Sequence, residues 1–594
     1  MNLLPTPRSL KRRPGSFLLP GQPHQSVKAT QSNHAPEHAE GYALSIRKSG
    51  IEIFYRDEPA LRAARATLSQ LIHEYGRRLP CLEIHDWPDF ARRGVMLDIS
   101  RGRVPNLKTL LDLATHLAAF KVNELQLYIE HTFAYRKYKS VWQGWGALTR
   151  KEMRRLDAHC RRLGIDLVPN QNSFGHLRYF LEHPRVKKLA EISEPYEDFS
   201  GDFVRRPSTL APNHPGTIPF LRGLYGELLP NFSSDFFNVG CDETWDLGRG
   251  QTKQLCHKKG KGAVYLDFLN RIHREVSRHG RRMMFWGDII LKYPKLISNL
   301  PGDVIALNWG YEANHPFERE TALFAKSRIP FYVCPGTSTW MTLVGKHDNA
   351  LRNLRRAAIT GRKRRAIGYL ITDWGDGGHP QPLAVSWLPF VAGAAMAWCE
   401  KSFNQSNLVP VLSREIFRDR AEAVAKAALA LGLSHRKLHF SEPNVTPLGA
   451  VIAAPPPEAR ELFCRNGLKY YARIQPRNIH AALREIQKQI RTLEKASRSK
   501  PAFHFGKTAI RELTLAARMA GQSCKFMLWQ QAVARGDNAR ARRMAQQGVE
   551  ELAQLEKDFN VFWPVRNKGN AEKCSLFLQW RIADYRKSIA RSSP

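Results

Sequence analysis

FFNVGCDETW, residues Phe236–Trp245, is an apolar run that ends in two adjacent carboxylates. Its aromatic and branched residues are typical of a short strand that is covered on both faces. Asp242 and Glu243 would be costly inside such a strand, unless it ended there at a solvent-reachable pocket. Because barrel enzymes carry their catalytic groups at the C-terminal ends of parallel strands, the stretch indicates a barrel strand. The alternative interpretation is that Asp242 caps the next helix and Glu243 is a solvated neighbour.

Further apolar runs on both sides of this stretch alternate with amphipathic helical patterns. The other runs are Val95–Ile99, Leu125–Ile129, Asp166–Pro169, Met283–Trp286, Val304–Trp309, Phe331–Cys334 and Ile367–Thr372. Helical spacing of apolar residues is found at 107–120, 152–163, 218–229, 264–279, 347–360 and 384–398. Eight strand–helix units over about 300 residues are typical of a (β/α)8 TIM barrel, while a doubly wound sheet rarely has so many.

The segments that flank the predicted barrel have different compositions. Tyr42–Ile46 and Ile51–Tyr55 alternate like paired strands, and Leu61–Tyr75 has helical spacing. Beyond Glu400 the strand patterns stop, and long basic amphipathic helices are predicted at 413–431, 467–496, 506–535 and 537–559. We therefore expect four parts: an irregular N-terminal segment (1–40) with an edge strand and a loose loop, a small α/β domain (41–90), a catalytic barrel (91–400) and an α-helical C-terminal domain (401–594).

The charge of the chain is strongly positive. It has 91 Lys and Arg against 54 Asp and Glu, a net charge of +37 and a pI of about 10.1. This excess favours anionic partners such as nucleic acid or acidic glycans, although it is spread along the chain in the manner of a solvated surface. No nucleic-acid-binding motif is present, so we expect an anionic glycan in preference to nucleic acid.

Cysteine usage and the N-terminus indicate where the protein resides. Its 9 cysteines are scattered singly without a CxxC pair, which fits free thiols in a reducing compartment. No secretory signal is visible in residues 1–20, and no uninterrupted apolar segment reaches the length needed to span a bilayer. We therefore expect a cytoplasmic protein with no transmembrane segment.

Acids and tryptophans follow the predicted strands, where a barrel would gather them into one pocket. Tryptophan faces stack on sugar rings, and carboxylates, amides and arginine bind hydroxyl groups, so this mixture favours a carbohydrate ligand. The pattern predicts no metal, since clustered His or Cys is missing, and no other cofactor, since there is no phosphate-binding GxxxxGK[ST] motif. The candidates are Arg93, Glu130, Asn172, His176, Asp242, Glu243, Trp286, Trp309, Trp340, Trp374 and Asp376.

Five of these strand ends resemble family 20 of the glycoside hydrolases, the β-N-acetylhexosaminidases. The stretch 238–244 (NVGCDET) resembles that family's Asp-Glu signature, and 93–101 (RGVMLDISR) resembles its first barrel strand. Weaker matches are Ser173–His176, Phe285–Asp288 and Trp374–Asp376. The resemblance covers residues 40 to 400 and implies a retaining exo-glycosidase, in which the 2-acetamido oxygen of the substrate acts as the nucleophile.

The resemblance also implies a role for most of the candidates. Glu243 is the expected general acid and base, and Asp242 the group that holds the acetamide N–H. Arg93 is expected to bind the 3- and 4-hydroxyls, and His176 to support Glu243. Trp286, Trp309 and Trp374 are the expected walls for the acetamide and the sugar.

Departures from the usual motifs mark a divergent branch of the family. The chain has YIEHTF at 128–133, where members usually have His-x-x-Asp-Asp-x-x-Trp, so Glu130 becomes the candidate partner of His176. Trp340 lies where a tyrosine is expected, and Asp376 stands for a glutamate that contacts the distal hydroxyls. The preference between GlcNAc and GalNAc is therefore open.

The sequence predicts an exo-acting retaining glycosidase that removes terminal β-linked N-acetylhexosamine. An alternative is a catalytically weak or inactive barrel that binds amino-sugar or acidic glycans. A nucleic-acid-associated protein, favoured only by the charge, is the third interpretation.

Overall fold

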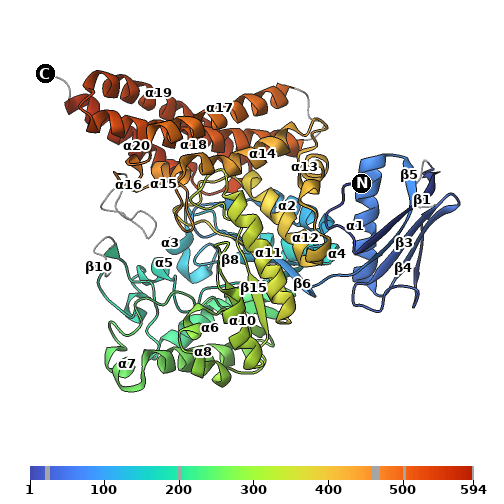
Figure 1. Cartoon of the computed structure of the whole chain (residues 1–594). Helices are drawn as coiled ribbons and strands as arrows, with labels where there is room; N and C mark the ends of the chain where they lie inside the picture. Colours follow the sequence, from blue (N-terminus) through green and yellow to red (C-terminus); the bar gives the residue numbers. More distant parts are fainter. Residues whose placement is uncertain (21–26, 198–203, 456–468, 499–503, 592–594) are drawn as a thin grey trace.

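The computed structural model describes residues 1–20, 27–197, 204–455, 469–498 and 504–591. Three parts follow one another along the chain: a small N-terminal domain, an eight-stranded barrel and a helical C-terminal domain (Figure 1). In Figure 1 the N-terminal domain (blue) stands to the side of the barrel, while the C-terminal helices (orange to red) lie across one end.

The N-terminal domain is a five-stranded sheet with one helix, α1 (Glu58–Tyr75), packed against it. Asp57 caps α1 by accepting the N–H of Ala60. The sheet order is β1 (Ser9–Leu18), β5 (Arg78–Asp86), β3 (Tyr42–Arg47), β4 (Gly50–Tyr55) and β2 (Val27–Gln31).

The prediction that residues 1–40 are irregular is wrong, because β1 and β2 both belong to this sheet. The register of β1 against β5 shifts between Arg12 and Ser16, at Pro14 and Gly15. Such a bulge interrupts the alternation of apolar and polar residues that marks a strand in a sequence.

The barrel contains the eight parallel strands predicted from the sequence, so the predicted fold class is confirmed. They are β6 (Arg92–Asp98), β8 (Glu124–Tyr128), β9 (Asp166–Val168), β12 (Phe236–Asn238), β13 (Arg282–Trp286), β14 (Ile305–Trp309), β15 (Phe331–Cys334) and β16 (Gly368–Asp373). Neighbouring strands in this order pair with each other, and β16 pairs with β6. The exception is β9 and β12, which a single bridge between Asn170 and Asn238 joins, and this bridge closes the ring.

Amphipathic helices cover the outside of the barrel. They are α2 (Leu107–Ala119), α4 (Arg150–Leu163), α6 (Thr217–Leu228), α8 (Lys261–Ser277), α10 (Phe317–Lys326), α11 (His347–Lys363) and α12 (Trp387–Cys399). Of these, α10 has no counterpart among the predicted helices. Large side chains such as Met96, Met284 and Tyr332 fill the interior, so the barrel is packed and has no pore.

Helix α12 lies in the most apolar segment of the described chain. Leu383–Ser402 is long and apolar enough to cross a membrane, yet all of its most apolar window is buried inside the protein. The same composition suits a helix covered by barrel strands on one side and by other helices on the other.

The C-terminal domain is built from α14 (Ala423–Leu433), α17 (Pro476–Arg498), α18 (His504–Ala534), α19 (Asn538–Phe562) and α20 (Ala571–Arg591). The single helix predicted at 413–431 is instead a π-helical turn, Leu412–Phe417, that ends at the left-handed residue Arg418 before α14 begins. The predicted start of the next helix, at 467 and 468, falls outside the described residues. Helix α20 was not predicted.

Contacts with loops that follow barrel strands fix this helical domain in place. The short strand β17 (Asn567–Lys568) pairs with β7 (Val104–Pro105), just after β6. Lys568 also forms an ion pair with Glu152 of α4 at 2.8 Å, and the Cys574 thiol donates to the carbonyl of Gly102. The helical domain therefore borders the end of the barrel at which the strands terminate.

Short elements occupy the connections between the longer ones. They are α3 (Lys139–Trp142), α5 (Arg178–Leu181), α7 (Lys253–Lys259), α9 (Asp288–Leu291), α13 (Leu408–Val411), α15 (Pro447–Ala453), α16 (Lys469–Ala472) and the pair β10 (Tyr196–Glu197) and β11 (Val204–Arg205).

Candidate active site

The turn after β12 presents two carboxylates side by side. Gly240, Cys241 and Glu243 all have left-handed backbone angles, with φ of 68°, 71° and 48°. For the two residues that are not glycine, this conformation costs about 1–3 kcal/mol each, and such strain gathers at functional sites. The Asp242 residue is 6% exposed, while the Glu243 side chain is 30% exposed.

Hydrogen bonds from the surrounding elements hold this turn in its strained shape. The Gly240 N–H donates to Asn238 Oδ1, and the Gly240 carbonyl accepts the N–H of Trp286, both at 2.9 Å. The hydroxyl of Tyr265, on α8, donates to the Cys241 carbonyl at 2.9 Å. Both carboxylates are therefore positioned by regular elements of the barrel.

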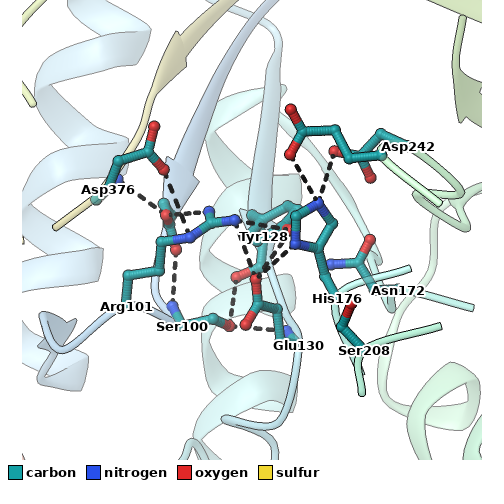
Figure 2. Close-up of polar contacts among 12 residues, drawn as sticks. Ser100, Arg101, Tyr128, Glu130, Asn172, His176, Ser208, Asp242 and Asp376 are labelled. Carbon is teal, nitrogen blue, oxygen red and sulfur yellow. Dashed lines mark hydrogen bonds and ion pairs between the residues drawn. The ribbon is translucent and has the colours of Figure 1, made fainter. Parts of the chain in front are cut away.

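His176 lies between the acidic pair and a third carboxylate (Figure 2). Its Nε2 is 3.3 Å from Asp242 Oδ2 and 3.4 Å from Glu243 Oε2, and its Nδ1 is 3.7 Å from Glu130 Oε1. Burial alone would lower the pKa of His176, but the carboxylates of Asp242, Glu243 and Glu130 raise it well above its ordinary value. The imidazole is therefore a cation that balances three acids.

Glu130 occupies the place expected for the partner of His176. It accepts the hydroxyl proton of Tyr128 at 3.1 Å, and its own N–H donates to Ser100 Oγ at 2.7 Å. Burial raises the pKa of Glu130, and the charges of Arg101 and His176 oppose that effect.

Arg101 is the arginine of the pocket. Its guanidinium lies 2.7 Å from Asp98, 3.1 Å from Glu130 and 3.5 Å from Asp376 (Figure 2). The rings of Tyr128 and Trp374 flank it, with their centroids at 5.0 and 5.3 Å. Burial raises the pKa of Asp376 to about 7, and the charge of Arg101 opposes it.

The prediction that Arg93 binds the sugar is wrong. Arg93 is near the start of β6, at the opposite end of the strand from Asp98, where it pairs with Glu40 of the N-terminal domain at 2.6 Å. It also donates to the carbonyl oxygens of Phe90 and Lys121. The C-terminal end of β6 faces the pocket, so the basic residue of the pocket is Arg101, which follows that end.

The four predicted tryptophans gather at one end of the barrel but differ in exposure. Trp286 has no exposed surface and Trp340 keeps 1%, so they support the pocket from within and do not line it. Trp374, 6% exposed, packs on Trp286 with ring centroids 5.7 Å apart. Trp309 is partly exposed, so in this conformation only Trp374 and Trp309 offer surface to a sugar.

Tyr311 is a pocket residue that the sequence reasoning missed. It stacks on Trp309 at 5.0 Å and lies edge-on to Trp340 at 5.1 Å, while its hydroxyl accepts the Trp374 Nε1–H at 2.7 Å. The sequence predicts an aromatic residue after the seventh barrel strand, whereas Tyr311 follows the sixth, β14. The available signal was the spacing of Trp309-Gly310-Tyr311 directly after β14.

Two further buried groups face the same region. Asp288 accepts the N–H of Glu243 at 3.3 Å, and burial, together with the charges of Asp242 and Glu243, raises the pKa of Asp288 to about 8. The buried amide of Asn172 packs against Gly240, and neither its Oδ1 nor its Nδ2 has a partner within the described part of the chain. Unpaired amide groups of this kind are available to a polar ligand.

His176, Asp242 and Glu243 also bring one potential metal-ligand atom each to within 4.8 Å of one another. The neighbouring carboxylates raise the pKa of His176, so a metal ion would have to displace the proton that they favour on the imidazole.

Comparisons with known proteins identify the family to which the chain is similar. Residues 90–356 match the family model of the glycosyl hydrolase family 20 catalytic domain, and residues 20–87 match the model of domain 2 of that family. A lacto-N-biosidase of Bifidobacterium bifidum is 24% identical over 49% of this chain and 26% of its own length. A beta-hexosaminidase of Vibrio furnissii is 26% identical over 41% of this chain and 45% of its own length. The chain thus spans less than half the length of these two relatives.

Solved structures share the architecture at low identity. The Flavobacterium johnsoniae chitobiase has a TM-score of 0.59 and 16% identity, over 97% of this chain and 99% of its own. A β-N-acetylhexosaminidase of Bacteroides fragilis has a TM-score of 0.57 and 18% identity, over 70% of this chain and 95% of its own. At these identities the likeness is one of fold.

Proposed function

Because the chain belongs to family 20 of the glycoside hydrolases, we propose that it is an exo-acting glycosidase that removes a terminal β-linked N-acetylhexosamine with retention of configuration. The observation that carries this proposal is the pair of adjacent carboxylates, Asp242 and Glu243, on a strained turn and bridged by His176. The two carboxylates differ in exposure, as two different roles require.

In the first step, the substrate supplies its own nucleophile. The 2-acetamido oxygen forms a bond to the anomeric carbon, while the bond from that carbon to the leaving oxygen breaks. Glu243, the more exposed carboxyl, gives its proton to the leaving oxygen. Asp242, buried beside it, accepts the acetamide N–H and stabilises the positive charge that develops on the oxazolinium ring.

In the second step, water opens the oxazolinium ring from the face that the leaving group has vacated. Glu243 now accepts a proton from this water, so it ends the cycle in its starting state. Two inversions at the anomeric carbon give net retention. The imidazolium of His176 compensates the negative charge of Asp242 and, once Glu243 has given up its proton, that of Glu243 as well.

Recognition of the sugar is assigned to the other side of the pocket. Arg101 and Asp376 offer a donor and an acceptor to the ring hydroxyls. Trp374 and Trp309, on which Tyr311 stacks, offer an aromatic wall. The proposed terminal sugar is N-acetylglucosamine or N-acetylgalactosamine.

The proposal is tested by release of 4-nitrophenol from its β-N-acetylglucosaminide and β-N-acetylgalactosaminide, with the plain β-glucoside as control. We expect turnover of an acetamido substrate, none of the glucoside, and loss of turnover in Glu243→Gln. Comparable turnover of the plain glucoside would contradict substrate assistance. Binding of the acetamido sugars without turnover, by protein shown to be folded, would favour an inactive sugar-binding barrel.

A further inference from the structure

A cation lies on the aromatic residue that follows the acidic pair. The guanidinium carbon of Arg205 is 3.9 Å from the centroid of the Trp245 ring. Trp245 belongs to the same turn as the general acid, since its N–H donates to the Glu243 carbonyl at 2.8 Å. The Trp245 ring is 5.8 Å from the ring of His176, which itself contacts both carboxylates.

Arg205 has no acidic partner among the residues that the structure describes. It is half-buried, at the end of β11, where its backbone pairs with that of Tyr196. Asp246, in the same loop as Trp245, is engaged by the backbone N–H groups of Ser208 and Thr209 at 2.8 and 2.9 Å. The neighbouring Arg206 is exposed and pairs with Glu182 at 3.6 Å.

A second cation lies on an aromatic group near Glu130. The ammonium of Lys573, at the start of α20, is 5.1 Å from the centroid of the Trp145 ring. Trp145 contacts His131, the neighbour of Glu130, and Tyr179, with ring centroids 5.2 and 5.0 Å apart. The surroundings of the acidic pair therefore carry positive charge from both the barrel and the helical domain.

Of the two pairs, Arg205 and Trp245 are the one joined directly to the turn of the general acid, and the leaving group is expected on this side. Glu243 has to come within hydrogen-bond reach of the leaving oxygen to protonate it, so the released residue extends past Glu243 towards Trp245. The guanidinium of Arg205 lies over the indole, and Arg205 keeps part of its surface exposed. Its N–H groups match the paired oxygens of a carboxylate or a sulfate.

We propose that the released residue of the natural substrate carries an anionic group, a carboxylate or a sulfate, and that Arg205 on Trp245 binds it. This inference rests on the proposed function, because it assigns the leaving-group side of that same site. The net charge of +37 agrees with it, since a basic surface raises the local concentration of an acidic glycan.

The test uses disaccharides that differ at one position. In both, a terminal β-linked N-acetylhexosamine is joined to a second sugar, which is glucuronic acid in one and glucose in the other. A third substrate carries a 6-sulfate on that glucose and separates the two anionic groups. We expect kcat/KM to be about tenfold higher for at least one anionic substrate than for the neutral one, as suits a charge-assisted hydrogen bond.

Two variants show whether Arg205 causes this preference. Arg205→Gln is expected to bring the ratio of anionic to neutral kcat/KM close to 1, and Arg205→Lys to retain part of it. Arg206→Gln, the matched control on the adjacent exposed residue, is expected to keep the wild-type ratio. Thermal unfolding of each variant verifies that it is folded.

Equal kcat/KM for all three disaccharides in the wild type would overturn the inference, and so would a preference that persists in Arg205→Gln. Failure of the proposed function is recognised separately, as absence of turnover of the 4-nitrophenyl acetamido sugars. In that case, the dissociation constants of the three disaccharides for Glu243→Gln protein decide the inference, with the same tenfold ratio expected.

Discussion

The Nε2 atom of His176 lies 3.3 Å from Oδ2 of Asp242, although the two residues follow different barrel strands. Their strands, β9 and β12, meet at the bridge between Asn170 and Asn238 that closes the barrel. The charged contact therefore spans the junction at which the ring of strands closes. It ties the protonation state of a histidine to the geometry of the acidic turn.

Replacing His176 with glutamine is expected to destabilise the protein in a pH-dependent manner. The folded-state pKa of His176 is raised above its unfolded value, so its stabilisation is complete below about pH 6.5 and is lost as pH rises through the folded pKa. We expect a difference in unfolding free energy of about 3 kcal/mol at pH 6, because buried carboxylates lose their counter-ion. Urea unfolding of both proteins from pH 6 to 10 measures it, and a difference that grows with pH would contradict this account.

The two carboxylates are expected to respond differently to the leaving group. Glu243→Gln removes the proton donor, so it should lower kcat/KM by about 10²–10⁴-fold for a disaccharide and by less for the 4-nitrophenyl glycoside, whose leaving group needs little protonation. Asp242→Asn weakens contacts with the acetamide, which both substrates share, so its loss should be similar for both. Steady-state kinetics on the two substrates separates the roles. If both variants showed the same ratio between the loss of kcat/KM on the disaccharide and that on the 4-nitrophenyl glycoside, the assignment would be wrong.

Replacing Arg101 with methionine is expected to reduce activity, whereas replacing Arg93 with methionine is expected to reduce stability. Arg101→Met should lower kcat/KM by about 10²-fold, because it removes a sugar contact and disturbs the orientation of Glu130 and Asp376. Arg93→Met leaves Glu40 without its partner in a buried contact between domains, and should cost about 3 kcal/mol of stability.

Kinetics and urea unfolding of the same two proteins test this contrast. The KM of folded Arg93→Met should match that of the wild type. A raised KM in that variant, with normal stability, would restore Arg93 to the sugar site.

Asp288 is expected to make the protein less stable as pH rises. Its folded pKa is raised to about 8 from an ordinary value of 3.8, so between these values the folded state holds a proton that the unfolded state has released. Stability contributed by this group is therefore complete below about pH 4 and declines by at most about 1.4 kcal/mol per pH unit up to about pH 8. Asp288→Asn should lack this decline. Unfolding free energies of both proteins measured from pH 5 to 8 test this, and parallel plots of stability against pH for the two proteins would contradict the prediction.

The barrel could be predicted from the sequence because its strands are buried on both faces and read as short apolar runs between helical patterns. An edge strand was expected within residues 1–40, but its bounds could not be predicted, since Pro14 and Gly15 interrupt its alternation at a bulge. The break before α14 was also hidden, because the left-handed turn at Arg418 involves no glycine or proline.

Within the site, local motifs located the acids but not all of their partners. Asp242, Glu243, His176 and Glu130 come together as the strand-end rule requires. Arg93 was misplaced because a motif gives the identity of a residue but not the end of the strand that it occupies. Tyr311 was not predicted because the loops determine which aromatic side chains line the pocket. An aromatic ring at one place in the pocket can come from either of two neighbouring loops.

Gly175 is expected to be indispensable for the acidic turn, for reasons of space. A Cβ at this position would lie 2.4 Å from the backbone oxygen of Asp242, a distance that neither group can accept without a shift. Gly175→Ala should therefore displace the loop that carries His176 from the turn that carries the carboxylates. Because a displacement of about 1 Å costs about 10²-fold in rate, we expect kcat to fall by that amount.

Gly226→Ala provides the matched control for this prediction. Gly226 lies inside α6 on the exposed side, and a Cβ there would meet nothing within 4 Å. Alanine favours the helix over glycine by about 0.5–1 kcal/mol, so this variant should be slightly more stable and keep its activity. Equal kcat in the two variants, measured with the aryl acetamido glycoside, would mean that the loop and the turn can separate without consequence, and would remove the structural basis for linking His176 to Asp242.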